Sequence, residues 1–319
     1  LTLELISCKA QYAHEIDGRL PQVNADGIIS IVDARHPLLD PKTAVPISLE
    51  LNDERRIMLI TGPNTGGKTV ALKTVGLLTI MMQSGLLVPL KESSQLSIFD
   101  QVFADIGDEQ SIMQSLSTFS SHLTKIIQMT DHVTDKTLVL LDELGSGTDP
   151  NEGVSLAIAI LNHFKTYNVR MMVTTHYSEL KSYAYEEPHM TTASVAFDKK
   201  SLKPLYYLHM GTTGSSHAFL IAKRLGLRDQ IISDAESLYQ GRQSDLNRIM
   251  EKLNDERLYV ERQKEKLLAE QERNRHEKME HRLAKEKLLR EQDDMLSKIR
   301  EKELSKWEDL KEEMRELIR

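Results

Sequence analysis

Up to residue 241, apolar residues form short continuous runs that alternate with stretches in which they recur every three or four positions. Continuous runs of about five or six residues, bounded by polar or turn-forming residues, are typical of buried strands. The strands predicted in this way cover residues 27–32, 45–49, 56–61, 137–141 and 169–175. Helical spacing is found within residues 1–20, 70–84, 123–127 and 151–165. Strands that alternate with helices predict an α/β fold with a parallel or mixed sheet.

The pattern changes after Gly241, the last glycine of the chain. Residues 242–319 contain neither Gly nor Pro, and more than half of them are charged. Apolar residues recur there every seven positions, at Leu246, Leu253, Val260 and Leu267. A second seam with steps of three and four residues includes Leu296, Ile299, Trp307, Leu310, Met314 and Leu317. We therefore predict two parts, a domain formed by residues 1–241 and a long charged helical tail formed by residues 242–319.

Heptad spacing favours a coiled coil in this tail. The apolar seam is poor between about 269 and 287, where Asn274, Arg275 and Lys278 stand at positions that would need apolar side chains. The prediction is therefore an interrupted coiled coil. A solvated single helix or a disordered charged tail is the alternative.

Charge and cysteine content narrow the classes of function. The tail holds 21 Lys and Arg against 21 Asp and Glu, so the formal net charge of −7 lies entirely on residues 1–241. This balance argues against a strongly DNA-attracting surface on the chain as a whole. No apolar run approaches the ~20 residues that a membrane span needs. The single cysteine, Cys8, excludes an internal disulfide and suits a reducing, cytoplasmic location. Because the chain begins with Leu1 rather than Met, we expect it to be a piece of a longer protein.

The segment GPNTGGKT fits the phosphate-binding pattern G-x-x-x-x-G-K-[ST] and lies between a predicted strand and a predicted helix, the context that the pattern requires. Its backbone N–H groups would curl around phosphates at the N-terminus of the helix. Lys68 would supply a cation to the phosphate oxygens, and Thr69 would offer its hydroxyl to Mg²⁺. The predicted nucleotide-binding residues are Gly62, Pro63, Asn64, Thr65, Gly66, Gly67, Lys68 and Thr69.

Two further predicted strands end in residues suited to phosphoryl transfer. The strand at 137–141 is followed by Asp142, which could hold Mg²⁺ opposite Thr69, and by Glu143, which could polarise the attacking water. The strand at 169–175 ends at His176, which could hydrogen-bond the γ-phosphate or that water. We predict Glu143, His176 and Lys68 as catalytic residues.

The segment STFSSH at 117–122 precedes a helical run. Ser or Thr at a helix start is most often only an N-cap. Its place between the phosphate loop and the Asp-Glu strand, however, resembles that of the signature helix in ATP-binding-cassette proteins. There, a helix N-terminus of one subunit closes on the γ-phosphate bound by the other. Ser117 is therefore predicted to act in trans, in an active site that is complete only in a dimer.

Taken together, GPNTGGKT, the STF signature, LLDELGSGTDP and TTHYSEL resemble the ATPase domain of MutS proteins, in the same order along the chain. The segments DIGDEQS, GTDPNEG and GTTGSSHAFLIAKRLGL are most similar to the type 2 branch of that family. The resemblance covers about residues 1–240. It implies an ABC-type ATPase domain that binds ATP through residues 62–69 and holds Mg²⁺ through Thr69 and Asp142. It also places His36 and Val45 where MutS proteins contact the adenine and ribose.

The resemblance implies a homodimer formed through two ATP sites. In the whole protein, arms attached to this motor would hold branched or mismatched DNA, or a stalled ribosome and its RNA. No segment resembles a mismatch-reading, clamp or Smr nuclease domain, so the endonuclease activity of the family is not expected in this chain. Two alternatives stay open: the nucleotide-binding subunit of a transporter, and a structural coiled-coil protein whose ATP site regulates assembly.

Overall fold

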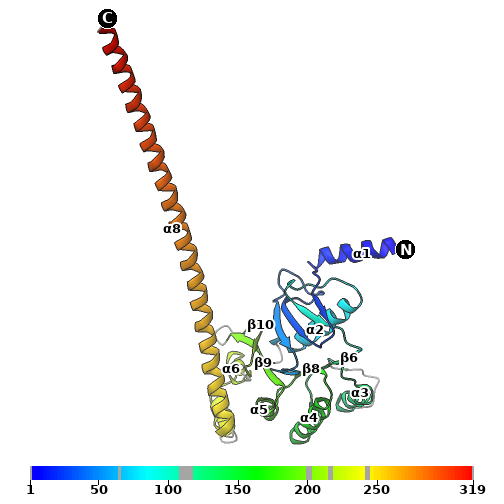
Figure 1. Cartoon of the computed structure of the whole chain (residues 1–319). Coiled ribbons are helices and arrows are strands. Elements are labelled where there is room, and N and C mark those ends of the chain that lie inside the picture. Colours follow the sequence, from blue (N-terminus) through cyan, green and yellow to red (C-terminus); the bar gives the residue numbers. More distant parts are fainter. Residues whose placement is uncertain are drawn as a thin grey trace. The chain divides into compact units, whose positions relative to one another are not determined.

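The computed structural model of the chain describes residues 2–63, 66–107, 118–198, 203–214, 218–240 and 245–317 (Figure 1). It divides into two compact units, Leu1–Asp255 and Glu256–Arg319. The strands of the described residues all lie in the first unit, and the second unit contains the greater part of helix α8 (Asp245–Leu317). No helix among the described residues is both long enough and apolar enough to cross a membrane.

A six-stranded sheet with the order β10-β9-β4-β8-β7-β6 forms the centre of the first unit. Its strands are β4 (Ile57–Thr61), β6 (Gln101–Asp105), β7 (Thr137–Leu141), β8 (Arg170–Thr174), β9 (Met190–Asp198) and β10 (Lys203–Met210). The β9–β10 pair is antiparallel and every other pair is parallel. The prediction of an α/β fold with a mixed sheet is confirmed. Because β4, β8 and β7 are parallel neighbours, their carboxyl ends meet at one edge of the sheet.

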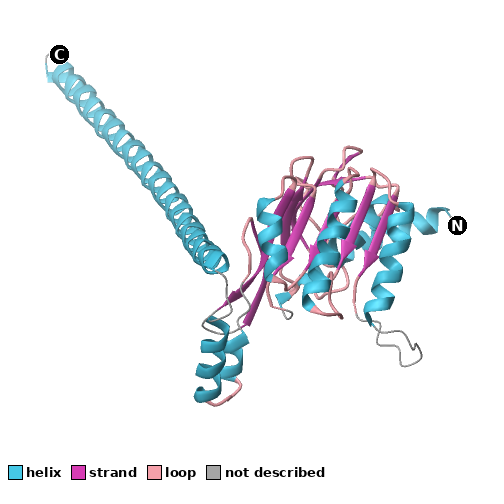
Figure 2. Ribbon diagram, turned by 90° about the horizontal axis from the view of Figure 1, so that it is seen from below, coloured by secondary structure: helices cyan, strands magenta, loops and turns pink. Residues whose placement is uncertain are grey.

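Both faces of this sheet are covered by helices (Figure 2). The covering helices are α2 (Lys68–Gln83), α3 (Thr118–His132), α4 (Pro150–Lys165) and α5 (Ser178–Glu186). Met58 and Ile60 of β4 belong to the apolar core shared with α2, whereas Ile57 and Leu59 belong to the core shared with α3, α4 and α5. This alternation explains why β4 is apolar at every position, since each side of the strand faces a packed helix layer.

A smaller four-stranded sheet has the order β1-β5-β2-β3 and packs against the α2 side of the core. Its strands are β1 (Gln22–Asn24), β2 (Ile29–Ala34), β3 (Ile47–Leu51) and β5 (Gln95–Ser97). The remaining helices of the first unit are α1 (Thr2–Glu15), α6 (Ala218–Arg224) and α7 (Asp229–Gln240). Helix α2 contacts strands of both sheets, so the helix that follows the predicted phosphate-binding turn is anchored on two sides.

Most predicted elements lie close to the observed ones, but α3 begins at Thr118, so residues 118–122 belong to the helix that they were expected to precede. The strand expected at 27–32 begins two residues later, at Ile29, and the strand expected at 45–49 begins at Ile47. Helix α8 runs without a break through residues 269–287, where the apolar seam weakens. The interruption therefore concerns the seam alone and does not break the helix, and the pairing of the tail into a coiled coil stays a prediction.

Candidate functional site

The turn between β4 and α2 carries the segment predicted to bind nucleotide, of which Asn64 and Thr65 lie outside the described residues. A Cβ atom on Gly62 would lie 2.5 Å from Cγ2 of Val195 in β9, and one on Gly66 would collide with the same methyl group. Only glycine therefore fits at these two positions, because the turn passes so close to the neighbouring strand. The turn is closed by a 2.9 Å hydrogen bond from the N–H of Gly66 to the carbonyl oxygen of Pro63.

Helix α2 begins at Lys68, and its N-cap residue, Gly67, makes no side-chain capping bond. The side chain of Lys68 is buried, and its Nζ donates a 2.7 Å hydrogen bond to the carbonyl oxygen of Gly62. Burial lowers the pKa of Lys68 below its ordinary value, while the negative charges of Glu143 and Asp142 oppose that shift. The amine is thus folded across the turn and lies within the electric field of both carboxylates.

Asp142 follows the last residue of β7 and is held by two threonine hydroxyls. Thr69 Oγ1, in the first turn of α2, donates a 2.7 Å hydrogen bond to Oδ2 of Asp142. Thr174 Oγ1, at the end of β8, donates a 2.5 Å bond to Oδ1 of the same carboxylate. The Asp142 N–H also donates to the carbonyl oxygen of Asp105 over 2.9 Å. The side chain of Asp142 is therefore fixed by α2 and β8, and its backbone by β6.

The oxygens of Thr69 and Asp142 fit a magnesium ion chemically. Mg²⁺ prefers oxygen ligands and usually takes one or two protein oxygens, with waters and substrate phosphates completing its shell. Among the described residues, no group of three or more His, Cys, Asp or Glu side chains is arranged to hold a metal. A site of this kind does not need such a group, since the nucleotide itself would supply oxygens.

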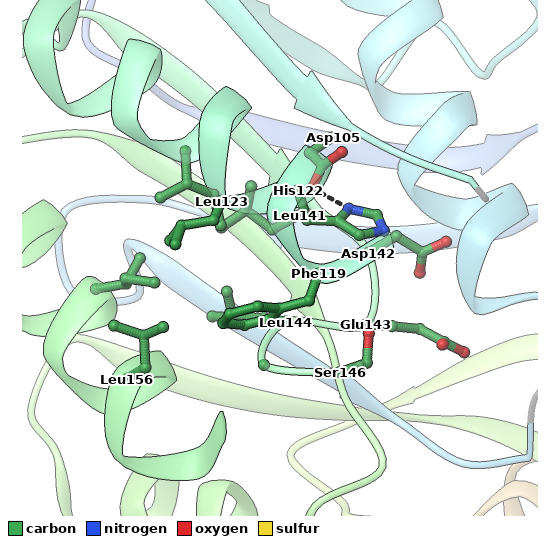
Figure 3. Close-up of a pocket in the computed structure, with 13 residues that line it drawn as sticks. Asp105, Phe119, His122, Leu123, Leu141, Asp142, Glu143, Leu144, Ser146 and Leu156 are labelled. Atoms are coloured by element: carbon green, nitrogen blue, oxygen red, sulfur yellow. Dashed lines mark hydrogen bonds and ion pairs between the residues drawn. The ribbon is translucent and has the colours of Figure 1, made fainter. Parts of the chain in front are cut away.

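Glu143 adopts a left-handed backbone conformation, with φ of 50°. This region is unfavourable for a residue with a side chain, and such strain is often found at functional sites. The N–H of Glu143 donates a 2.8 Å bond to Thr174 Oγ1, and Leu144 N–H donates to the Thr174 carbonyl oxygen over 3.1 Å. In Figure 3 the carboxylates of Asp142 and Glu143 point to the same side, away from the apolar side chain of Leu156. The strained backbone thus directs two successive carboxylates to one place.

His176 lies just after β8 and is exposed. Its ring stacks against Tyr177, with ring centres 4.6 Å apart, and Tyr177 Oη donates to the Gly145 carbonyl oxygen over 3.2 Å. Burial raises the pKa of Tyr177, and the charges of Asp149 and Glu143 act in the same direction. Tyr177 therefore connects the His176 segment to the loop that follows Glu143.

The residues predicted to contact the base and ribose lie in the smaller sheet's part of the domain. His36 follows β2, and its Nδ1 accepts a 3.3 Å bond from the N–H of Leu38. Burial lowers the pKa of His36, and the positive charge of Lys73 on α2 lowers it further. Val45 is 39% exposed, shortly before β3. Ser117 lies outside the described residues, directly before α3.

The structure adds three residues to this site that sequence reasoning missed. Thr174 bonds both the carboxylate of Asp142 and the backbone N–H of Glu143. The only signal for this role in the sequence is its place two residues before His176. Asp105 and His122 form a 2.5 Å contact between Oδ2 and Nδ1, beside the Asp142–Glu143 pair (Figure 3). Asp105 lies beside Asp142 because, in the parallel pairing of β6 with β7, Asp105 stands opposite Leu141, the residue before Asp142.

The family model of MutS domain V matches residues 58–242, which include the turn between β4 and α2, the Asp142–Glu143 pair and His176. An α/β domain of that family therefore accounts for more than half of the chain.

Curated relatives extend the match. "Endonuclease MutS2" of Finegoldia magna is 48% identical over 281 residues, which are 86% of this chain and 36% of the relative. The protein of that name from Lactobacillus acidophilus is 49% identical over 249 residues, 78% of this chain and 32% of the relative. A third, from Clostridium botulinum, is 48% identical over 276 residues, 83% of this chain and 35% of the relative. The chain belongs to the MutS family and, within it, to the type 2 branch. It spans about a third of the length of the curated relatives it matches.

Proposed function

We propose that this chain is the ATP-binding and ATP-hydrolysing motor domain of a MutS type 2 protein. The observation that carries the proposal is the hydrogen bond from Thr69 to Asp142, with Lys68 and Glu143 beside it. This bond brings the phosphate-loop helix and the Asp-Glu strand end to one point. Membership of the MutS family favours a motor over the nucleotide-binding subunit of a transporter.

Each residue of the site has a separate role in the proposed hydrolysis. The turn at 62–69 and the N-terminus of α2 bind the phosphates, and Lys68 neutralises part of their charge. Thr69 and Asp142 would hold Mg²⁺, which would neutralise charge on the phosphate oxygens when bound. The oxygen of a water then bonds to the γ-phosphorus while the bond to the β–γ bridging oxygen breaks. Glu143 accepts the proton that the water loses, so ADP and inorganic phosphate are the products.

His176 and Ser117 are assigned to the γ-phosphate. His176 is exposed at the end of β8, where a bound nucleotide could reach its ring. Ser117 directly precedes α3, and we propose that it meets the γ-phosphate of the partner subunit in a symmetric dimer with two composite sites. His36 and Val45 are proposed to contact the base and ribose.

The whole protein would use this motor to move its remaining parts. The relatives are named endonucleases, so DNA that is branched or mismatched is one proposed partner of the complete protein. A ribosome is the other proposed partner. In both cases the motor would open and close the two halves of a dimer, and α8 would connect it to the next part of the chain.

ATP turnover by the Glu143→Gln variant tests the proposal. Removing the base should lower kcat by about 10²-fold or more while ATP still binds. Glu152→Gln, an exposed glutamate in the first turn of α4, is the matched control and should hydrolyse ATP at the wild-type rate. Wild-type turnover in Glu143→Gln would remove Glu143 from the mechanism. Absence of ATP binding in the unmodified chain would overturn the proposed function as a whole.

A further inference from the structure

Helix α3 is attached to the sheet by polar contacts from two of its side chains to one buried carboxylate. Asp105, the last residue of β6, is 2% exposed. Its Oδ2 lies 2.5 Å from Nδ1 of His122, and its Oδ1 lies 3.3 Å from Nζ of Lys125. His122 and Lys125 stand three positions apart on α3 and therefore project from the same face of the helix. A carboxylate buried to this extent needs such partners, because an unpaired buried charge is costly.

The same residue also holds Asp142 through its backbone. The carbonyl oxygen of Asp105 accepts the 2.9 Å hydrogen bond from the Asp142 N–H, and Asp105 pairs in register with Leu141. Asp105 thus contacts α3 with its side chain and the backbone N–H of Asp142, the residue proposed to hold magnesium, with its main chain. A shift of α3 would therefore either move Asp142 as well or break the contact between His122 and Asp105.

The ring of His122 links Asp105 to the pocket that contains Asp142 and Glu143. His122 lines the same pocket as Asp142 and Glu143, and in Figure 3 its ring stands between the carboxylates of Asp105 and Asp142. Because a carboxylate only accepts hydrogen bonds, the proton of this contact lies on Nδ1 of the histidine. The ring is therefore held in one orientation at the edge of the site.

We propose that His122 is a positioning residue for ATP hydrolysis: its bond to Asp105 fixes the first turns of α3 against the strand end that carries Asp142. This inference rests on the proposed function, in which the residue directly before α3 meets the nucleotide of the partner subunit. A helix that is free to shift would misplace that residue, and small displacements of a positioning group lower the rate strongly. Nucleotide binding within one subunit uses the turn at 62–69 and does not depend on this bond.

Replacing His122 tests the inference through several readouts. In His122→Ala we expect kcat to fall about tenfold or more, with the affinity of a single subunit for ATP changed less than about twofold. ATP-dependent dimerisation, measured by sedimentation in the Glu143→Gln background, should weaken in parallel. His132→Ala is the matched control, since His132 is an exposed histidine on the last turn of the same helix, bonded to the Gln128 carbonyl oxygen.

Two conservative variants separate the anchoring bond from a general loss of packing. The side-chain nitrogen of asparagine can take the place of Nδ1, so His122→Asn should restore at least half of the lost rate. The amide nitrogen of glutamine takes the place of Nε2, so His122→Gln should remain close to the alanine variant. Rescue by glutamine and not by asparagine would overturn the anchoring role.

Two further results would overturn the proposed role of His122. Wild-type kcat and dimerisation in His122→Ala would overturn the inference, as would equal losses of ATP affinity and thermal stability that asparagine does not restore. The proposed function is judged separately by Lys68→Ala and Glu143→Gln. If those two variants behave as expected while His122→Ala turns over normally, only the inference about His122 fails.

Discussion

The hydroxyl of Thr69 donates a 2.7 Å hydrogen bond to Oδ2 of Asp142, which lies 73 positions farther along the chain. This bond joins the first turn of α2 to the end of β7. Lys68 precedes one of the two residues and Glu143 follows the other, so four polar groups meet where parallel strands end. Ligands of open α/β sheets bind at such carboxyl ends.

Lys68 should be needed for nucleotide binding. Lys68→Ala removes the buried cation next to the phosphate turn, and we expect ATP affinity to fall by about tenfold or more, since a charge-assisted bond contributes ~1.5–3 kcal/mol. Equilibrium binding of a fluorescent ATP analogue measures this. Lys91→Ala, which removes an exposed lysine paired with Asp33, should bind as the wild type does. Unchanged affinity in Lys68→Ala would contradict the phosphate-loop assignment.

The lowered pKa of Lys68 makes ATP binding sensitive to alkaline pH. In the proposed function ATP binding uses the charged amine, so affinity should begin to fall at a pH below ~10.4, where an exposed lysine is still charged. Glu143→Gln removes a charge that raises this pKa, so the fall should move to lower pH. In the absence of ATP the unfolded chain binds the proton more tightly than the native one, and the free energy of unfolding should rise with pH across that window. A pH profile of affinity that is identical in both proteins would contradict this account.

Thr174 should stabilise the site and the fold together. Thr174→Val keeps the shape of a buried side chain but leaves Asp142 Oδ1 and the Glu143 N–H without their partner. We expect a loss of about 1–3 kcal/mol in the free energy of unfolding, measured with urea, and a lower kcat. Thr79→Val is the control, because Thr79 is equally buried and bonds only the Val75 carbonyl oxygen of its own helix. Equal losses in the two variants would argue against a special role of Thr174.

Arg170 should matter for stability and not for chemistry. This guanidinium is 1% exposed, and its nitrogens donate to the carbonyl oxygens of Gly27, Asp26 and Asn168 over 2.7, 3.1 and 3.2 Å. Arg170→Met leaves those oxygens unpaired and should lower the free energy of unfolding by about 1–3 kcal/mol. ATP affinity at a temperature where the variant is folded should stay at the wild-type value. Arg55→Met, at an exposed position, should leave both quantities unchanged.

The seam on α8 should support association between two copies of the tail. Leu253, Val260 and Leu267 are 59%, 63% and 56% exposed and stand seven positions apart. Replacing Val260 and Leu267 by Gln should weaken any self-association that remains in the Lys68→Ala variant, where nucleotide cannot drive it. Sedimentation without ATP measures this, with Lys264→Gln as the control. Association that is unaffected by both seam changes would contradict the coiled-coil prediction.

The sequence predicts those parts of the fold whose physics is local. The apolar strands β4, β7 and β8 and the glycine-rich turn before Lys68 are encoded in short segments, and each lies within about two residues of its predicted place. Asp142 and Glu143 could be named because they directly follow such a strand.

Other features depend on how distant segments meet. Asp105 and His122 come together because α3 packs against β6, and the segments DIGDEQS and STFSSH, in which they stand, do not mark them as partners. In the sequence Arg170 is a polar residue at the start of a strand, which gives no sign that it is buried. Its burial is possible because carbonyl oxygens more than 140 positions away accept its hydrogen bonds. The β9–β10 pair was also missed, because β9 combines apolar residues with two buried hydroxyl-bearing ones, Thr192 and Ser194.

Sedimentation of the Glu143→Gln variant, with and without ATP and Mg²⁺, tests the central claim most directly. A motor with composite sites predicts a monomer that becomes a dimer only when ATP and Mg²⁺ are both present, since this variant should hydrolyse ATP too slowly to leave the ATP-bound state during the run. The same experiment with Lys68→Ala added should give no nucleotide-dependent dimer. A Glu143→Gln protein that binds ATP and Mg²⁺ yet sediments identically in their presence and absence would contradict the composite-site account.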